Sequence, residues 1–132
     1  MIFVDTSFWV ALRNARDTRH EEAAVLLSSA RDAHLVTSNH VRGETWTFLQ
    51  TRVGHRSAVD YLDAIGASSR LQVVHIPPEM ENTALSWLRR HDERRYSFVD
   101  ATSFGLMRSM KIKDALAFDG DFSAAGFREL RV

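Results

Sequence analysis

The sequence predicts an α/β fold in which a short parallel sheet is flanked by helices. Short apolar runs alternate with longer amphipathic segments, and each apolar run is only a few residues long, as buried parallel strands are. Hydrophobic residues make up 45% of the 132 residues and charged residues 26%, which are ordinary values for a globular protein. A chain of this length buries enough surface for one core, so we expect a single domain over residues 1–132.

Capping and turn residues delimit the elements of the first half of the chain. Asp5 ends the first apolar run, the segment TRHE at 18–21 has the spacing of a capping box, and Gly54 follows a long helical segment. The predicted elements are a strand over 2–4, helices over 7–12 and about 18–31, a strand over 35–36, and helices over about 38–53 and 56–67.

The second half continues the same alternation. Pro77 and Pro78 end the third apolar run, and Pro78 suits the first turn of the helix that follows. The predicted elements are a strand over 71–76, helices over about 78–90 and 97–110, a strand over 115–118 and a short strand over 129–132. Open parallel sheets bind ligands beyond the carboxyl ends of their strands, which points to Asp5 after the first strand and Asp119 after the fourth.

Composition excludes several classes of protein. A net charge of +0 argues against a purely electrostatic nucleic-acid binder. The absence of cysteine excludes a disulfide framework, a zinc ribbon and an iron–sulfur cluster. No apolar run reaches the roughly 18 residues of a membrane span, and no signal peptide is recognisable, so we expect a cytoplasmic protein.

Four acidic residues stand in apolar surroundings, where carboxylates are rare unless they are paired or bound to a metal. They are Asp5 in FVDTSFW, Glu44 in VRGETWTF, Asp100 in YSFVDATSF and Asp119 in LAFDGDF. Neither Glu44 nor Asp100 has a Lys or Arg three or four residues away, where a helical salt bridge would need one. For each acid, a role as a cap, a turn residue or a long-range ion-pair partner stays open, and Ser97 has capping-box spacing from Asp100.

If the four carboxylates converge, they repel one another. At 6 Å and an effective dielectric constant near 20, each pair costs about 3 kcal/mol, and a divalent cation removes that cost. Ligands that are all oxygen, without cysteine or paired histidine, select Mg²⁺ or Mn²⁺. Such an ion activates water and neutralises phosphate oxygens, which is the usual route to phosphodiester hydrolysis.

The order Asp5, Glu44, Asp100, Asp119 resembles the PIN-domain ribonuclease family, and most of all the VapC-type toxins of bacterial toxin–antitoxin pairs. The resemblance runs from the first strand into the segment DGDF at 119–122 and so covers essentially the whole chain. It implies a PIN-like α/β/α sandwich and a Mg²⁺-dependent endoribonuclease in which Mn²⁺ can substitute. It also implies a cognate VapB-type antitoxin and a homodimeric toxin.

The resemblance also implies roles for individual residues. The four catalytic acids that hold the metal would be Asp5, Glu44, Asp100 and Asp119, with Asp121 as an auxiliary ligand. Thr6 would orient Asp5 or a water, or act as a helix-start hydroxyl. The sequence departs from the family's pattern at Ala117, where many relatives carry Thr or Ser, so a hydroxyl near Asp119 is missing. Whether one or two ions bind stays open.

Two further groups of residues allow a functional and a structural interpretation. The arginines of the segment 89–95 would grip RNA phosphates or belong to a solvated, self-paired loop; they are Arg89, Arg90, Arg94 and Arg95. A second group would form a groove for an antitoxin helix or pack in the core; its members are Trp9, Leu12, Trp46 and Phe48.

The predicted reaction is the attack of water on an RNA phosphodiester, leaving 5′-phosphate and 3′-hydroxyl ends. Two alternatives stay open: a catalytically idle PIN-like module that binds RNA or an antitoxin, and a DNA-directed nuclease of the same architecture. The segment FDGDF also suggests a haloacid-dehalogenase-like phosphatase, but that family needs further motifs downstream, and the chain ends soon after Asp121. The RNA that is cleaved is not specified by the sequence.

Overall fold

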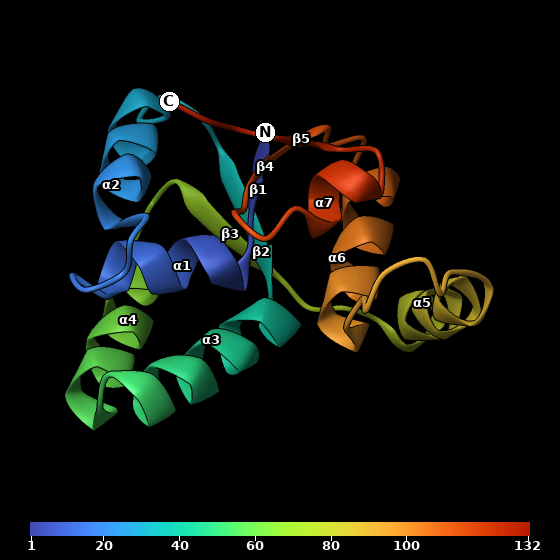
Figure 1. The fold of residues 1–132 in the computed structure, drawn as a ribbon, viewed down its shortest axis with the longest axis horizontal. Helices are drawn as coiled ribbons and strands as arrows, with labels where there is room; N and C mark the ends of the chain where they lie inside the picture. Colours follow the sequence, from blue (N-terminus) through green and yellow to red (C-terminus); the bar gives the residue numbers. More distant parts are fainter.

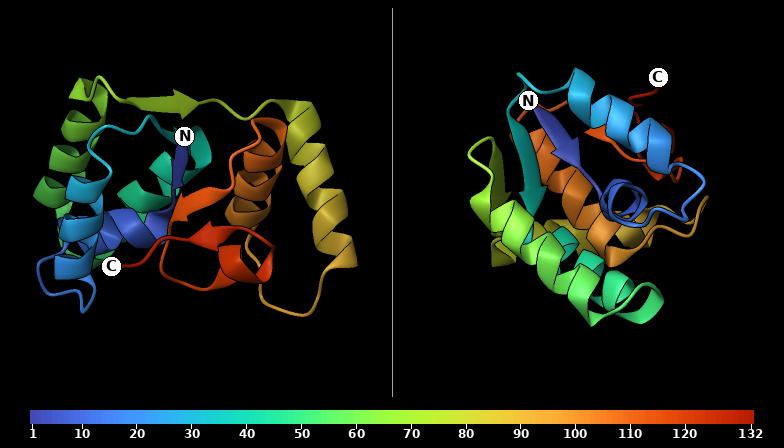
Figure 2. Two further views of the ribbon diagram at one scale, coloured as in Figure 1. Left: turned by 90° about the horizontal axis from the view of Figure 1, so that it is seen from above. Right: turned by 90° about the vertical axis from the view of Figure 1, so that its left-hand side faces the viewer.

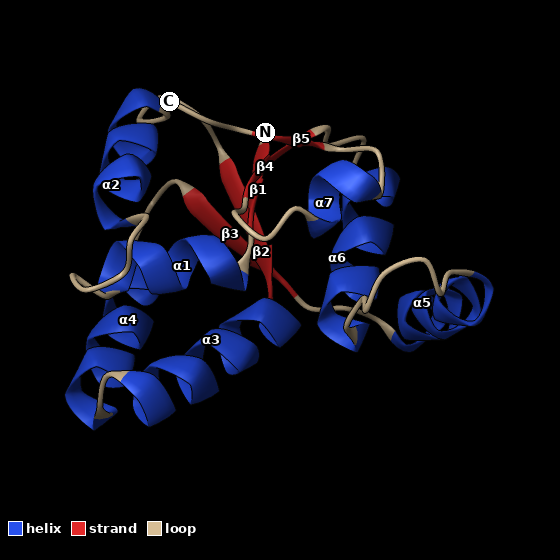
Figure 3. Cartoon of the chain, viewed as in Figure 1, coloured by secondary structure: helices blue, strands red, loops and turns tan.

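The computed structural model describes all residues, 1–132, and has a five-stranded sheet flanked by seven helices (Figures 1 and 3). The strands are β1 (Ile2–Val4), β2 (Leu35–Ser38), β3 (Leu71–Val74), β4 (Asp114–Leu116) and β5 (Arg128–Glu129). The helices are α1 (Thr6–Arg13), α2 (His20–Ser29), α3 (Asn39–Arg52), α4 (His55–Ala67), α5 (Pro78–Arg90), α6 (Phe98–Ser109) and α7 (Asp121–Ala124).

The sheet is entirely parallel, in the order β3-β2-β1-β4-β5. In the central strand, Ile2 lies opposite Leu35 of β2 and Asp114 of β4. The helices that connect β1, β2 and β3 lie on one side, and α5, α6 and α7 lie on the other (Figures 1 and 2). The predicted α/β fold is therefore confirmed, and the strand order reverses between β1 and β4.

Side-chain caps start three of the helices directly after a strand or a loop. The Asp5 carboxylate accepts a hydrogen bond from the Ser7 N–H at the start of α1, and Ser38 Oγ accepts one from Val41 N–H at the start of α3. Ser97 and Asp100 form the reciprocal capping box that the sequence predicts for α6. These caps satisfy N–H groups that a helix leaves without internal partners.

The structure corrects the prediction for the start of the second helix. No capping box forms over 18–21: α2 begins at His20, and Arg19, in the N-cap position, makes no side-chain cap. Asp17 Oδ1 instead accepts a hydrogen bond from Arg19 N–H at 2.8 Å, which stabilises the preceding turn.

The strands differ in length from the prediction, and α7 was not predicted. The third strand ends at Val74 instead of Ile76, because the Ile76 N–H donates to the side chain of Asn39 at 2.9 Å and leaves the ladder. The fourth ends at Leu116, since the Phe118 N–H donates to Ser7 Oγ at 2.9 Å. Only four residues long, α7 carries too little periodicity to be recognised in a sequence.

An aromatic cluster packs the second helical layer together. Phe104 of α6 is fully buried, and its ring lies 5.4 Å from Trp87, 5.7 Å from Tyr96 and 5.0 Å from Phe122, centroid to centroid. The rings therefore join α5, the loop after it and α7 to α6. None of the seven helices is both long enough and apolar enough to cross a bilayer.

The aromatic cluster yields a test of where stability resides. Replacing Phe104 with Ala removes a ring that is 0% exposed and should lower the free energy of unfolding by about 3–5 kcal/mol, as measured by urea denaturation. The matched control is Phe48→Ala, because Phe48 is 37% exposed, and it should cost less than about 1 kcal/mol. Equal losses of unfolding free energy for the two variants would contradict the conclusion that the cluster around Phe104 stabilises the fold.

Candidate active site

Four acidic residues from four different segments line one cavity at the carboxyl end of the sheet. Asp5 directly follows β1, Asp119 follows β4, Glu44 lies on α3 and Asp100 lies in the first turn of α6. The cavity, called the acid cavity below, has a volume of about 470 Å³. It lies where β1 and β4 are neighbours and the strand order reverses, which is the position at which open parallel sheets bind ligands.

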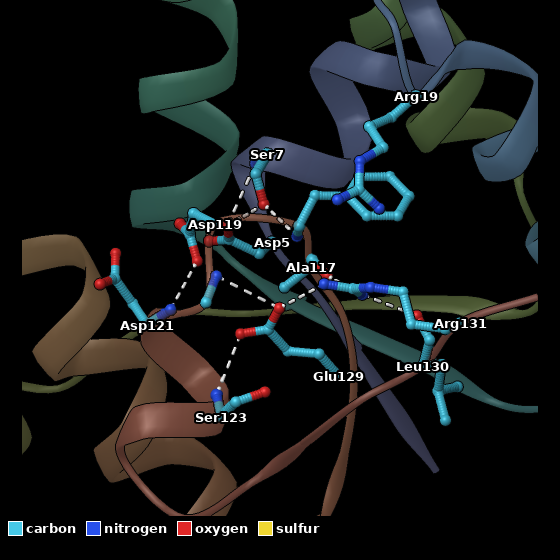
Figure 4. A network of polar contacts seen from close by, with 12 residues as sticks. Asp5, Ser7, Arg19, Ala117, Asp119, Asp121, Ser123, Glu129, Leu130 and Arg131 are labelled. Carbon is cyan, nitrogen blue, oxygen red and sulfur yellow. Dashed lines mark hydrogen bonds and ion pairs between the residues drawn. The ribbon is translucent and has the colours of Figure 1, made fainter.

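Asp5 is held by Ser7 two residues further on. Asp5 is only 2% exposed, and its Oδ2 accepts hydrogen bonds from Ser7 N–H at 3.1 Å and Ser7 Oγ–H at 2.7 Å. Ser7 Oγ in turn accepts a hydrogen bond from Phe118 N–H at 2.9 Å, one residue before Asp119 (Figure 4). A single hydroxyl therefore connects the segment after β1 to the segment after β4.

Three carboxylates gather closely at the acid cavity, two of which, Asp100 and Asp119, line it. One oxygen from each of Asp100, Asp119 and Asp121 lies within 4.8 Å of the other two, and this group is called the three-carboxylate cluster below. Asp100 uses Oδ2 to accept a hydrogen bond from Ser97 N–H at 2.9 Å, and Asp119 uses Oδ1 to accept one from Asp121 N–H at 3.1 Å. Asp100 therefore takes part in the capping box of α6 and lines the acid cavity at the same time.

The cluster is not the set of four acids predicted from the sequence. Asp5 and Glu44 line the same cavity but lie outside the three-carboxylate cluster, while Asp121, predicted as auxiliary, belongs to it. Thr6 also lines the cavity, and its Oγ1 lies 3.3 Å from Thr45 Oγ1, to which it is hydrogen bonded.

Burial and neighbouring charges raise the pKa values of Asp5, Asp100 and Asp119. Burial and then the charge of Asp119 raise the pKa of Asp5 to about 8, although the hydrogen bonds from Ser7 oppose this. Burial also raises the pKa of Asp100 to about 6. For Asp119, burial and then the charge of Asp121 raise the pKa to about 6, even though part of the side chain is open to the cavity. Oxygen ligands whose charges oppose one another in this way fit a divalent cation.

One basic side chain, that of Arg94, contacts the three-carboxylate cluster. Arg94 Nε donates to Asp121 Oδ1 at 2.9 Å, and Arg94 Nη2 lies 3.4 Å from the backbone oxygen of Asp119. Arg89 and Arg90 are exposed in the last turn of α5, and Arg95 is exposed in the loop after it. Among the four arginines predicted to bind RNA, Arg94 is therefore the one that contacts the acids.

Arg19 is the one basic residue among those that line the acid cavity. Its Nη1 pairs with Glu22 at 2.8 Å, and its guanidinium carbon lies 5.1 Å from the centre of the Phe118 ring.

The four residues predicted to form an antitoxin groove lie in different places. Trp9 is 6% exposed and belongs to the core, and it lines with Leu12 a mainly apolar cavity of about 170 Å³ beside α1, α2 and α4. Phe48 lines the acid cavity, and the half-buried Trp46 packs edge-on against His55 with ring centres 5.6 Å apart. The four residues therefore do not line one common groove: Trp9 and Leu12 line an apolar cavity, and Phe48 lines the acid cavity.

The comparisons with known proteins agree with this architecture. The PIN domain family matches residues 2–128. The "23S rRNA-specific endonuclease VapC20" of Mycobacterium tuberculosis, strains CDC 1551 / Oshkosh and H37Rv, is 58% identical over 131 residues, which are 99% of this chain and 98% of the relative. The crystal structure of M. tuberculosis VapC20, described as a sarcin–ricin loop cleaving toxin, superposes with a TM-score of 0.94 at 56% identity and covers 100% of both chains.

The raised pKa of Asp5 predicts how stability depends on pH without a metal. The unfolded chain loses its Asp5 proton near pH 3.8, whereas the folded chain keeps it up to about pH 8. In EDTA, stability should therefore fall as the pH rises from about 4 to 8. Asp5→Asn keeps the helix cap and removes this loss, so the variant should melt at a higher temperature than the wild type at pH 8.

The control for Asp5→Asn is Asp63→Asn, at an exposed site on α4, which should leave the pH dependence of the melting temperature unchanged. A buried ion-pair role for Asp5 makes the opposite prediction. Asp5→Asn would then cost about 3–5 kcal/mol, because an uncompensated charge would remain.

Proposed function

The chain belongs to the PIN domain family, and we propose that it is a VapC-type toxin whose substrate is the sarcin–ricin loop of 23S ribosomal RNA. It is an endoribonuclease that hydrolyses an RNA phosphodiester. The observation that carries the proposal is the acid cavity, set in a chain that matches an RNA-cleaving relative over 99% of its length.

We propose that Asp5, Glu44, Asp100 and Asp119 hold Mg²⁺, for which Mn²⁺ substitutes, and that Asp121 assists. The raised pKa values of Asp5, Asp100 and Asp119 support this, because a bound divalent cation would offset the burial and mutual repulsion that disfavour their charged forms. When bound, such a cation lowers the pKa of water and neutralises charge that builds on phosphate oxygens.

The chain's own residues orient the acids and the substrate. Ser7 fixes one oxygen of Asp5, and Ser97 N–H fixes one oxygen of Asp100, so both carboxylates face the cavity in a single orientation. We propose that Arg19, at the cavity wall, contacts a phosphate of the RNA. Water attacks the phosphorus in line, the bond to the 3′-oxygen breaks, and that oxygen takes a proton to give 3′-hydroxyl and 5′-phosphate ends.

A cleavage assay on an RNA oligonucleotide with the sarcin–ricin loop sequence tests this function. We expect cleavage in millimolar Mg²⁺ or Mn²⁺, none in EDTA, and a loss of at least about 100-fold for Asp100→Asn and Asp119→Asn. Asp63→Asn serves as the matched control and should retain the wild-type rate, because Asp63 is exposed on α4. Metal at 100 times its Kd should also stabilise the wild type by about 2.7 kcal/mol.

The same assay distinguishes the alternatives. Metal binding without cleavage of any RNA would support the catalytically idle module, and faster cleavage of the matching DNA oligonucleotide would support the DNA-directed nuclease. Cleavage that persists in EDTA, or in both Asp→Asn variants, would contradict the proposed metal site.

We also propose that a VapB-type antitoxin binds this protein and that the toxin forms a homodimer. The feature that supports the antitoxin proposal is the 170 Å³ cavity beside α1, α2 and α4, where Trp9, Leu12 and Leu27 offer apolar contacts. An amphipathic helix laid there would place a basic residue near the acid cavity, because α1 contributes residues to both cavities. Light scattering of the purified chain tests the homodimer.

The antitoxin proposal predicts the effect of a charge in the apolar cavity. Co-expression with the neighbouring VapB-type gene should give a tight complex without nuclease activity. Leu27→Glu should weaken that complex at least about 10-fold in a titration, because Leu27 lines the cavity. Leu85→Glu, at an exposed site on α5 in the other helical layer, is the control and should bind normally. A complex that cleaves RNA as fast as the free protein would refute the proposal.

A further inference from the structure

The segment that carries Asp119 is not fixed by the sheet. β4 ends at Leu116 and α7 begins at Asp121, so the intervening residues 117–120, called the Asp119 turn below, lie outside both elements. Ala117 is fully buried, and its methyl side chain has neither a donor nor an acceptor. Gly120 has a φ of +81°, a conformation that favours glycine. The backbone groups of this turn therefore need partners from elsewhere in the chain.

Glu129 supplies one of those partners and also binds the start of α7. It lies in β5, its side chain is 1% exposed, and the N–H of the next residue, Leu130, donates to Ala115 O of β4 at 2.9 Å. Glu129 Oε1 accepts a hydrogen bond from Gly120 N–H at 3.2 Å, and Oε2 accepts one from Ser123 N–H at 3.0 Å. One carboxylate oxygen thus binds the backbone N–H directly after Asp119, and the other binds the helix α7 that follows the turn (Figure 4).

Arg131 completes the arrangement on the other side of Asp119. Its Nη2 donates to Glu129 Oε1 at 2.8 Å, and its Nη1 donates to the backbone oxygen of Ala117 at 2.8 Å (Figure 4). The planar guanidinium therefore joins the Ala117 carbonyl, before Asp119, to the Glu129 carboxylate. That carboxylate in turn binds Gly120 N–H, directly after Asp119. In addition, the guanidinium carbon lies 5.2 Å from the centre of the Phe118 ring.

We propose that Glu129 and Arg131 are positioning residues that fix the Asp119 turn, so that the Asp119 carboxylate is ready for a divalent cation and for RNA cleavage. Together they are called the Glu129–Arg131 clamp. The inference rests on the proposed function, because the clamp is proposed to position Asp119, which we place in the metal site. Neither residue touches the reacting atoms, and each acts through Asp119.

An ion pair between β4 and β5 offers a matched comparison. Arg128 of β5 donates to both oxygens of Asp114 of β4, at 2.8 Å each. This pair lies at the amino end of β4, whereas the Asp119 turn follows its carboxyl end. A variant of Arg128 removes an ion pair between β4 and β5 but leaves every contact of the Asp119 turn in place.

The test compares Glu129→Gln and Arg131→Gln with Arg128→Gln in the full chain. Glutamine at 129 has one carbonyl oxygen for three donors, so a hydrogen bond to Gly120 or Ser123 is lost without a change in size. Arg131→Gln removes the link to Ala117 and keeps β5. The readouts are amide hydrogen exchange at Gly120 and Ser123, Mn²⁺ affinity by calorimetry, and kcat and KM for RNA cleavage.

We expect both clamp variants to bind Mn²⁺ at least about 10-fold more weakly and to lose at least about 10-fold in kcat, with KM changed less than about threefold. Exchange at Gly120 and Ser123 should accelerate in Glu129→Gln. Arg128→Gln should stay within twofold of the wild type in Mn²⁺ affinity and kcat, and Arg131→Lys, which keeps the charge, should recover part of the loss.

Two results would overturn the clamp. The first is that the clamp variants keep wild-type Mn²⁺ affinity and kcat, and the second is that Arg128→Gln loses as much as they do, which would indicate a role in stability alone. If Glu129→Gln does not fold, Arg131→Gln alone decides between these outcomes. Should the wild type fail to cleave RNA, the proposed function fails, whereas hydrogen exchange and Mn²⁺ affinity still decide on the clamp.

Discussion

The repulsion among carboxylates gathered in one partly buried cavity is the constraint on which the rest of this structure depends. Without a cation, burial and neighbouring charges disfavour the charged forms of Asp5, Asp100 and Asp119 and raise the pKa values of all three. A fold that collects such groups must hold them by other means, because their mutual interaction drives them apart. The parallel sheet provides the frame, since β1 and β4 lie side by side and end at the same edge.

Three of the acids that line this cavity are held through a backbone group that needs a partner in any case. Asp5 caps α1, Asp100 lies in the capping box of α6, and Asp119 accepts the hydrogen bond of Asp121 N–H within its own turn. In each of the three, one carboxylate oxygen serves local structure. Helix capping and the candidate chemistry therefore use the same side chains, so the structural role of Asp100 is compatible with the metal-binding role proposed for it.

Local sequence signals predicted most of the fold, and distance along the chain explains what they could not. The helix over residues 78–90 follows from Pro78, and the start of α6 follows from the spacing of Ser97 and Asp100. The four acids could be selected from their apolar neighbours, whereas the closeness of Asp121 to Asp100 and Asp119 depends on the folded turn. By contrast, the hydrogen bond from Phe118 N–H to Ser7 Oγ joins residues that are 111 apart in the sequence, and no local sequence pattern predicts it. The segment Asp-Thr-Ser places Ser7 where it can donate to the Asp5 cap, and this is the one local signal that could have pointed to Ser7.

The bond between Ser7 and Phe118 also bears on when the site exists during synthesis. A ribosome makes Asp5 well before the segments that surround it, because the central strand β1 pairs with β4, which lies beyond six of the helices in sequence. The contacts that orient Asp119 come later still, from Glu129 and Arg131. Because such distant segments pair late in folding, a growing chain carries the acids before it has the cavity. The acids of this nuclease therefore become a site only when segments far apart in the sequence have come together.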